Sequence, residues 1–344
     1  IQICDYNFSR KMGILTLQTQ KVRRMHMSSK VISNGKKHIS LFGKEMKKNG
    51  ALYMMFLPAA VFLILFNYLP LGGLVIAFKD FNFVDGMFGS DWMHPLFENF
   101  RFLFSSKSAI RAFVNTLVLN LIFIVMGVIC EVGLALLLNE IRGKFFKKIS
   151  QTFTLLPYFV SWVVVGAFIY NLFSTDHGII NSILEKFGHE GIGWYSEAGY
   201  WPTILTIINR WKLTGYGAII YFATLSGIDS SYYEAAEIDR ATRWQQIRYI
   251  TIPLLTPTII VMTLLSVGKI MNADFGMFYA VIGDSPMLLP TTDVIDTFVY
   301  RSLRQTGDIG MASAAGFVQS IISFVLVLAS NMLARRYDKD SAIF

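Results

Sequence analysis

The chain has 344 residues, of which 53% are hydrophobic and only 16% are charged. Because a soluble globular domain normally carries about a quarter charged residues, this composition argues against a soluble protein and indicates an integral membrane protein. The formal net charge is +8, but no nucleic-acid-binding motif accompanies it, so we interpret it as the charge of membrane-flanking segments.

The first element in chain order is a basic segment. Residues 1–50 contain eleven Lys or Arg residues against Asp5 and Glu45. We expect this segment to lie in the cytoplasm beside anionic lipid, and part of it to be disordered or to precede the native start. It does not resemble a signal peptide, because no apolar core precedes a small-residue cleavage site. Residues 51–344 are then predicted to form the transmembrane domain.

Six apolar stretches follow, each long enough to cross about 30 Å of hydrocarbon as a helix. We therefore predict an all-α integral membrane protein with six transmembrane helices. The fourth and fifth stretches differ from the others because they contain or adjoin charged residues. The predicted spans cover residues 51–78, 113–138, 152–173, 201–225, 254–282 and 312–333.

The charges between the predicted spans indicate their orientation. Residues 139–150 carry four basic residues against Glu140, whereas residues 174–200 carry Lys186 against four acidic residues. By the positive-inside rule, the first of these connections lies in the cytoplasm and the second faces outward. With six spans, both termini and the connection between the fourth and fifth spans are then cytoplasmic.

The connection between the fourth and fifth spans contains two capping motifs. Ser231 and Glu234 fit the capping box S-x-x-E, and Thr242 and Gln245 repeat it as T-x-x-Q. Two short helices are therefore predicted to begin there. We expect Pro253 to stop or kink the second helix.

The second of these short helices has one apolar stripe, because Trp244, Ile247 and Ile250 recur every three residues. A surface projection that presents its tip to another protein would have this pattern. An amphipathic loop that stabilises the helix bundle would have it too. The stripe alone leaves both interpretations open.

Residue patterns for catalysis, metal binding and nucleotide binding do not occur in the sequence. Cys4 and Cys130 have no paired spacing, and the five histidines form no HExxH motif. No G-x-x-x-x-G-K-[ST] loop is present. We therefore predict no catalytic residue, no metal site and no cofactor bound by this chain.

The residue order of the charged connection is specific. It contains Glu234, Ala235, Ala236, Asp239, Ala241, Ile250, Pro253 and Pro257. This order, placed before the penultimate span, resembles the EAA loop of the inner-membrane permeases of ABC importers. One residue departs from the family pattern, which usually has glycine after the aspartate where this chain has Arg240. Glycine accommodates a positive φ at such a turn, so we expect Arg240 to adopt a different turn or to gain a compensating contact.

The resemblance extends from residue 51 to the C-terminus. Residues 131–181, with an Ala-Leu-Leu-Leu run, an Arg-Gly turn and a Leu-Pro pair, look like the second and third spans of carbohydrate-type permeases. Residues 297–326 resemble that family's outer loop and last span. The sequence "EIDRATRWQQIRYITIP" is most similar to permeases for complex oligosaccharides and polysaccharide fragments.

The resemblance implies a multi-pass subunit of an ATP-driven bacterial importer in the plasma (inner) membrane. Such a permease forms the translocation path with a second homologous permease and receives sugar from an extracytoplasmic sugar-binding protein. It couples to two ATPase subunits, identical or different, which bind ATP and Mg²⁺. The permease itself is not an enzyme, and its partners include membrane lipid but no nucleic acid. The residues implied in ATPase coupling are Glu234, Ala235, Ala236, Asp239, Arg240 and Ala241.

The fourth predicted span contains the candidates for a sugar path. Its side chains combine hydrogen-bonding groups with aromatic faces, and two glycines allow the helix to bend or a ligand to approach. Interface anchoring by Trp and Tyr, and helix packing by Gly, explain the same residues equally well. The candidate path residues are Asn209, Trp211, Thr214 and Tyr216, and the glycines are Gly215 and Gly217.

Charged residues within the spans require partners or access to water, because an isolated charge at the bilayer centre costs about 2.5 kcal/mol or more. We expect an Arg or Lys partner for Glu131. Arg210, Lys212 and Lys269 either line the path, where they suit an acidic sugar such as a uronic-acid oligomer, or snorkel to the interface.

An ion-coupled secondary transporter of sugars is the alternative function. Such transporters commonly contain repeated halves, and residues 51–173 show no convincing repeat in residues 201–333. A channel and a membrane scaffold are further alternatives. None of the three explains the residue order of the EAA-like loop.

Overall fold

The computed structural model describes residues 48–141 and 143–337 of the chain. These residues belong to two compact units, one ending at Gly72 and one beginning at Gly73. Most of the basic segment predicted for residues 1–50 lies outside the described residues.

The first unit contains most of one long helix. Residues 48–63 are helical and continue into the π-helical turn η1 (Ile64–Tyr68) and the 3₁₀ segment η2 (Leu69–Phe78). Pro70 removes an amide donor and the following glycines weaken the α-helical preference, which explains the change of helix type. Together Lys48–Phe78 are long and apolar enough to cross a membrane.

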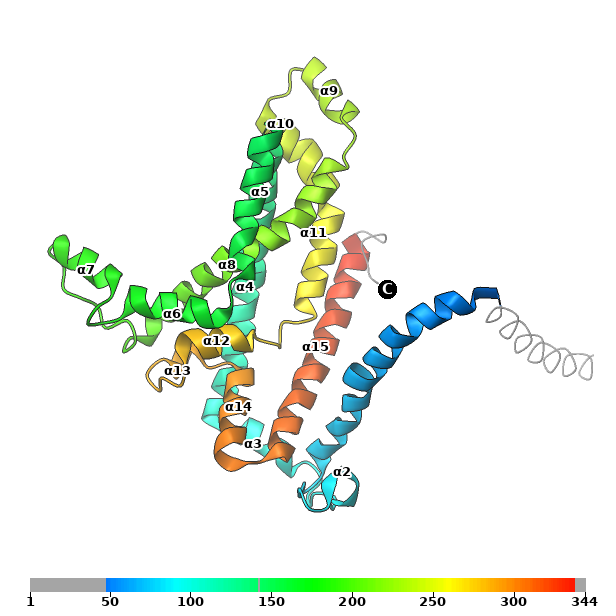
Figure 1. Cartoon of the computed structure of the whole chain (residues 1–344), viewed down its shortest axis with the longest axis vertical. Helices are drawn as coiled ribbons and strands as arrows, with labels where there is room; N and C mark the ends of the chain where they lie inside the picture. Colours follow the sequence, from blue (N-terminus) through cyan, green and yellow to red (C-terminus); the bar gives the residue numbers. More distant parts are fainter. Residues whose placement is uncertain (1–47, 142, 338–344) are drawn as a thin grey trace, which may run out of the picture. The chain divides into compact units, whose positions relative to one another are not determined.

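The regular secondary structure of the second unit, within its described residues, consists of helices, and an isolated antiparallel bridge joins Lys79 and Trp92. Its longest helix is α4 (Lys107–Glu140), which begins where the Ser106 side chain accepts a hydrogen bond from the Ala109 amide. The helices α4, α5 (Lys144–Phe159), α8 (Trp201–Ser226) and α11 (Ile252–Val267) pack together (Figure 1). The bounds of the remaining helices are given below.

The third predicted span is not one straight helix. Residues 152–173 divide between α5 and α6 (Trp162–Phe173), whose axes differ by 91°. Val160 and Ser161 are extended at the break, and the Ser161 hydroxyl accepts a hydrogen bond from the Val164 amide to cap α6. The prediction of a single uninterrupted helix was therefore wrong, because a local run of apolar residues does not report a change in direction.

The fifth predicted span is also interrupted. α11 ends at Val267, and α12 (Phe275–Ile282) begins only after residues 268–274. The Asp274 carboxylate accepts a hydrogen bond from the Met277 amide and caps α12. The apolar stretch 254–282 thus contains two helices separated by a segment rich in backbone turns.

Within the described residues, four helices are long and apolar enough to cross a membrane, and the bent α5–α6 pair makes a fifth if it is one span. The four are Lys48–Phe78, Lys107–Glu140, Arg243–Val267 and Ile309–Arg336. The fourth predicted span is present as the continuous helix α8. It is not among these four helices, because its polar and charged residues make it less apolar than they are. The total of six spans stays a prediction.

The connection between α6 and α8 is held by one buried amide. The Asn181 side chain on α7 (Ile179–Lys186) accepts hydrogen bonds from the Ile192 amide at 3.1 Å and from Trp194 Nε1 at 2.8 Å. It donates one to the Ile192 carbonyl at 2.9 Å. These bonds fix the chain that leads through η3 (Ala198–Tyr200) into α8.

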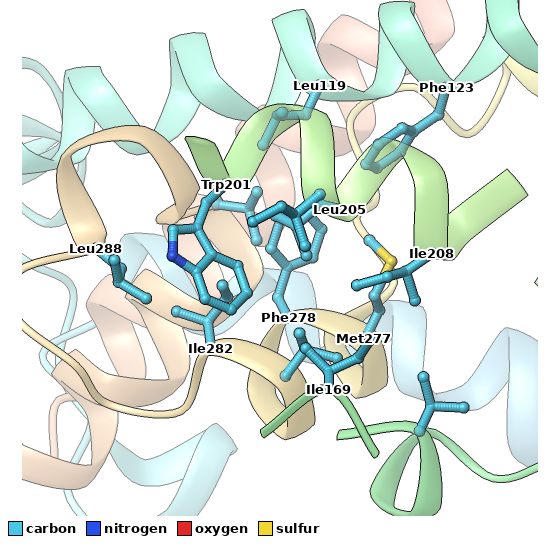
Figure 2. Packing of buried hydrophobic residues seen from close by; sticks show 14 residues of the cluster. Leu119, Phe123, Ile169, Trp201, Leu205, Ile208, Met277, Phe278, Ile282 and Leu288 are labelled. Carbon is cyan, nitrogen blue, oxygen red and sulfur yellow. The ribbon is translucent and has the colours of Figure 1, made fainter. Parts of the chain in front are cut away.

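The largest hydrophobic core lies where α8 meets α4, α6 and α12 (Figure 2). Trp201 and Leu205 on α8 are fully buried there and pack with Phe278 on α12. The Trp201 indole donates a hydrogen bond to the Trp194 carbonyl at 2.7 Å, so its polar atom is satisfied within the core.

Short helices lie near each end of α4. α9 (Ser231–Ile238) and α10 (Arg243–Gln246) are at one end, and α3 and α14 are at the other (Figure 1). The π-helical turn η4 (Ile247–Thr251) joins α10 to α11. The other elements are α2 (Gly86–Gly89), α3 (Glu98–Ser105), α13 (Leu289–Thr292), α14 (Ile295–Thr306) and α15 (Ile309–Tyr337).

Candidate functional site

A pocket of about 420 Å³ opens between α4, α8, α11 and the segment 268–274. Side chains from all four elements line it, together with Tyr158 near the end of α5. Its volume falls within the range typical of small-molecule sites. We call it the α4–α8 pocket.

A buried ion pair forms part of the wall of the α4–α8 pocket. The Glu131 carboxylate on α4 lies 3.3 Å from Arg210 Nη1 on α8, and the side chains are 17% and 12% exposed. Asn209 adds an acceptor, because its side-chain oxygen receives hydrogen bonds from the same guanidinium. The expectation that Glu131 has a basic partner is confirmed.

Two tyrosines form an aromatic surface in the same pocket. The Tyr158 and Tyr216 rings stack with centroids 4.4 Å apart and an angle of 10° between their planes. They are 37% and 50% exposed, so their faces and hydroxyls remain partly accessible. Aromatic faces next to hydrogen-bonding groups suit the alternating apolar and hydroxyl surfaces of a sugar.

Two of the four candidate path residues line the pocket. Asn209 and Tyr216 do so, whereas Trp211 and Thr214 do not. Trp211 is 52% exposed elsewhere on α8. The Thr214 hydroxyl is buried with no hydrogen-bond partner among the described residues. The sequence-based set therefore combined residues from different faces of one helix.

The two glycines of α8 lie where other parts of the chain pack closely against the helix. A methyl group on Gly215 would collide with the Thr154 carbonyl of α5. A methyl group on Gly217 would collide with the Glu131 carboxylate. The glycines thus allow α5 and the Glu131 carboxylate to approach α8, which agrees with the helix-packing interpretation of these residues.

Lys212 stabilises the α5–α6 break and not the pocket. Its ammonium donates hydrogen bonds to the carbonyls of Pro157, Tyr158 and Val160. It also lies 5.1 Å from the centroid of the Trp162 ring. The Pro157 carbonyl also accepts a hydrogen bond from the Val160 amide at 3.2 Å. Carbonyls at the end of a helix lack the usual amide partners, so one lysine contacts several of them at once.

The short helix α9 begins close to the predicted residue but with a different cap. The Asp229 carboxylate accepts a hydrogen bond from the Ser231 amide at 2.9 Å, and Ser230 Oγ donates to Glu234 Oε1 at 3.1 Å. The Ser231 amide lowers the pKa of the Asp229 carboxyl. The predicted S-x-x-E capping box at Ser231 was therefore wrong, because the preceding aspartate already supplies the acceptor.

The end of α9 explains how the chain tolerates Arg240. The Arg240 amide donates to the Glu237 carbonyl at 3.0 Å, and the Ala241 amide donates to the Ala236 carbonyl at 2.9 Å. These two bonds form a Schellman motif, which requires a left-handed residue at its turn. Arg240 has φ 55° and takes that conformation. The expectation of a different turn is thus not met.

The second short helix begins as predicted. Thr242 and Gln245 form a capping box, in which the Gln245 side chain accepts from the Thr242 amide at 2.7 Å. Pro253 does not stop the helix, since residues Arg243–Val267 are continuous. The π-helical turn η4 precedes the proline, and Pro253 lies in the first turn of α11, where its missing amide is tolerated.

The surface of α9 and α10 is largely open. Most of the candidate coupling residues are exposed, with Ala236 and Ala241 half-buried. The apolar residues Ile238 and Trp244 are 83% and 67% exposed. The predicted stripe is split, because Ile247 and Ile250 are half-buried while Trp244 projects outward. The exposed candidates are Glu234, Ala235, Asp239 and Arg240.

Relatives with assigned names align along most of the chain. Protein LplB of Bacillus subtilis (strain 168) is 32% identical over 295 residues, which cover 86% of this chain and 92% of the relative. The polygalacturonan/rhamnogalacturonan transport system permease protein YteP of the same strain is 32% identical over 289 residues, covering 84% and 89%.

A solved structure has the same fold. A chain of a bacterial ABC transporter involved in the import of the acidic polysaccharide alginate superposes with a TM-score of 0.77 and 33% identity, covering 86% of this chain and 98% of that chain. The same transporter is also known in complex with a periplasmic protein bound to an alginate pentasaccharide.

The match to a family model agrees with these relatives. Residues 124–339 match the model described as binding-protein-dependent transport system inner membrane component. This range includes α8, the α9–α10 loop and most of the α4–α8 pocket. The chain therefore belongs to the family of inner-membrane permease components of binding-protein-dependent ABC transport systems.

Proposed function

We propose that the chain is a permease subunit of an ATP-driven bacterial importer of oligosaccharides or polysaccharide fragments. The observation that carries this proposal is the similarity over 86% of the chain to a subunit of the alginate importer. The polygalacturonan/rhamnogalacturonan permease YteP supports the same class of cargo. The aromatic and hydrogen-bonding lining of the α4–α8 pocket fits such a cargo.

The proposed topology has six spans and cytoplasmic termini. Four long apolar helices, the bent α5–α6 pair and α8 together supply six crossings. The basic residues between α4 and α5 support a cytoplasmic position for that connection. The same topology places the α9–α10 loop in the cytoplasm.

The proposed partners follow from this arrangement. A second homologous permease completes the translocation path, and an extracytoplasmic sugar-binding protein delivers the cargo. Two cytoplasmic ATPase subunits, identical or different, bind ATP and Mg²⁺ and contact the exposed α9–α10 loop. Glu234, Ala235, Ala236 and Asp239 form the contacting helix and its end, because this surface is open in the described residues. Arg240 and Ala241 complete the turn that orients it.

The proposal is tested with the whole complex. This chain is co-expressed with the second permease and the ATPase, purified in detergent and reconstituted with the binding protein. Glu234→Lys is expected to weaken ATPase capture and to abolish sugar-stimulated ATP hydrolysis. Glu185→Lys, which makes the same charge change at an exposed position on α7, serves as the matched control and is expected to leave ATPase capture intact.

The outcomes separate the proposal from a secondary transporter. Uptake that needs ATP and an intact Glu234 supports the importer. Uptake that follows an ion gradient without ATP contradicts it. If the Glu234→Lys complex captures the ATPase fully and keeps full activity, the proposed coupling role of α9 is contradicted.

A further inference from the structure

In the part of the chain that the structure describes, the α4–α8 pocket contains one cation, Lys269, whose side chain has no partner. Lys269 lies in the segment 268–274 that interrupts the helical path between α11 and α12. Its side chain is exposed and lines the pocket. Among residues 48–141 and 143–337, no carboxylate pairs with it. Its ammonium group is therefore available to a ligand in the pocket.

The other charges of the pocket are already engaged. Glu131 and Arg210 neutralise each other at 3.3 Å. The Asp274 carboxylate accepts hydrogen bonds from Trp162 Nε1 at 2.7 Å and from the Met277 amide at 3.2 Å. Among the described residues, Lys269 is then the one charged side chain of the pocket that has neither an ion pair nor a hydrogen bond.

The pocket also contains the apolar surface that a sugar ring requires. The stacked Tyr158 and Tyr216 line it with Lys269, and Asn272 adds an exposed amide from the same segment. An unpaired ammonium, an amide and an aromatic surface recognise a sugar ring that carries a carboxylate. The pocket volume of about 420 Å³ limits the bound part to a short portion of an oligosaccharide.

We propose that Lys269 is a specificity-determining residue that binds the carboxylate of a uronic-acid residue in the transported oligosaccharide. The sugar ring packs against Tyr158 or Tyr216, and Lys269 selects acidic over neutral rings. This inference rests on the proposed function and deepens it. It names the chemical class of the cargo and the Lys269 ammonium as the group that recognises it.

The first test measures uptake of trigalacturonate by the complete complex in proteoliposomes. Lys269→Gln is expected to raise the concentration for half-maximal uptake by about tenfold, the effect of losing one charge-assisted hydrogen bond. Lys269→Arg keeps the charge and is expected to stay within about threefold of wild type. Lys107→Gln, which removes an exposed lysine at the start of α4 outside the pocket, is the matched control and is expected to have no effect.

The second test separates the charge from the shape of the side chain. Lys269→Cys is made with Cys4→Ser and Cys130→Ser, so that the only thiol in the given sequence of this chain is at the pocket, and the complex without Lys269→Cys controls for thiols of the other subunits. Reaction with 2-aminoethyl methanethiosulfonate forms a disulfide with the thiol, releases methanesulfinate and restores an ammonium. Reaction with the 2-hydroxyethyl reagent adds a neutral group of similar size. Only the aminoethyl reagent is expected to restore uptake.

The outcomes distinguish this inference from the proposed function. Normal uptake by Lys269→Gln overturns the inference, as does equal recovery with both reagents. A parallel loss of basal ATP hydrolysis also overturns it, because it indicates a structural role. A wild-type complex that imports only neutral oligosaccharides refutes the role of Lys269 and leaves the importer intact. A complex that imports no oligosaccharide refutes the proposed function itself.

Discussion

The Glu131 carboxylate on α4 lies 3.3 Å from the Arg210 guanidinium on α8, and neither side chain is more than 17% exposed. The pair joins α4 and α8, which pack against each other and both line the pocket. A buried ion pair need not stabilise a protein more than apolar residues do, but loss of one partner leaves an uncompensated charge. The two residues are thus coupled energetically.

Removal of one partner is expected to destabilise the subunit more than removal of both. Arg210→Gln and Glu131→Gln should each lower the free energy of unfolding by about 3 kcal/mol, because the remaining charge is buried without a partner. The double variant should recover part of this loss. Thermal unfolding of the purified complex measures the effect, and additive losses in the double variant would show that the pair is not coupled.

Close packing at Gly217 gives a second prediction. Gly217→Ala places a methyl group against the Glu131 carboxylate and is expected to destabilise the protein by about 1–3 kcal/mol through overpacking. Gly133→Ala on α4 meets no atom within 4 Å and serves as the control. It should be neutral or stabilising by up to about 1 kcal/mol, because alanine favours a helix over glycine. Equal melting temperatures for the two variants would contradict the packing role.

Of two aromatic residues on α8, Tyr216 lines the pocket and Trp211 does not. Tyr216→Ala removes a side chain that lines the pocket and should lower sugar uptake by about tenfold, the loss expected for one good aromatic contact. Trp211→Ala removes a larger ring that does not line it and should leave uptake unchanged. Uptake is compared with basal ATP hydrolysis in proteoliposomes. A parallel fall in both activities for Tyr216→Ala would indicate damaged packing instead.

The turn after α9 predicts the effect of restoring the family's usual residue. Arg240 has a positive φ, which costs a non-glycine residue about 1 kcal/mol. Arg240→Gly should therefore keep ATPase coupling and raise stability slightly, whereas Arg240→Val should lose both, because a β-branched residue is strained there. Sugar-stimulated ATP hydrolysis and thermal unfolding test this. Loss of coupling in Arg240→Gly would assign a direct contact to the guanidinium.

Helices were predictable from the sequence, whereas their directions were not. The apolar runs at residues 152–173 and 254–282 satisfy the length of a span, so a window of hydrophobicity reads each as one helix. Lys212 reaches the break after α5 from α8 and donates a hydrogen bond to the Tyr158 carbonyl. Such a tertiary contact leaves no local signal apart from Pro157, which lies inside α5.

The candidate path residues were only partly predictable, because they were chosen without regard to the face of α8 on which each one lies. Asn209, Tyr216 and Ile220 face the pocket, along with Leu213, and their spacings of three and four residues describe one face of a helix. Trp211 falls outside that spacing. A choice by side-chain chemistry alone therefore mixed faces that the helical period separates.

Asp296 on α14 is a buried carboxylate that is held by neutral donors. Its Oδ2 accepts hydrogen bonds from the Ala273 amide at 2.9 Å and from Gln319 Nε2 at 3.4 Å. Burial is the largest influence and raises the pKa of this carboxyl above its ordinary value of 3.8, while the hydrogen bonds act in the opposite direction. The folded protein therefore holds this proton more tightly than the unfolded chain does.

The sign of this shift fixes the pH dependence. The contribution of Asp296 to stability is fully present below pH 3.8 and is lost as the pH rises through the raised pKa of the folded state. Asp296→Asn removes the titration but keeps an oxygen acceptor for the Ala273 amide. Its melting temperature should thus fall less than that of wild type as the pH rises from about 4 to about 7. Asp176→Asn, at an exposed acid in the connection before α7, should follow wild type. If Asp296→Asn shows the same pH slope as wild type, the buried carboxylate at the α11–α12 break does not govern stability in this range.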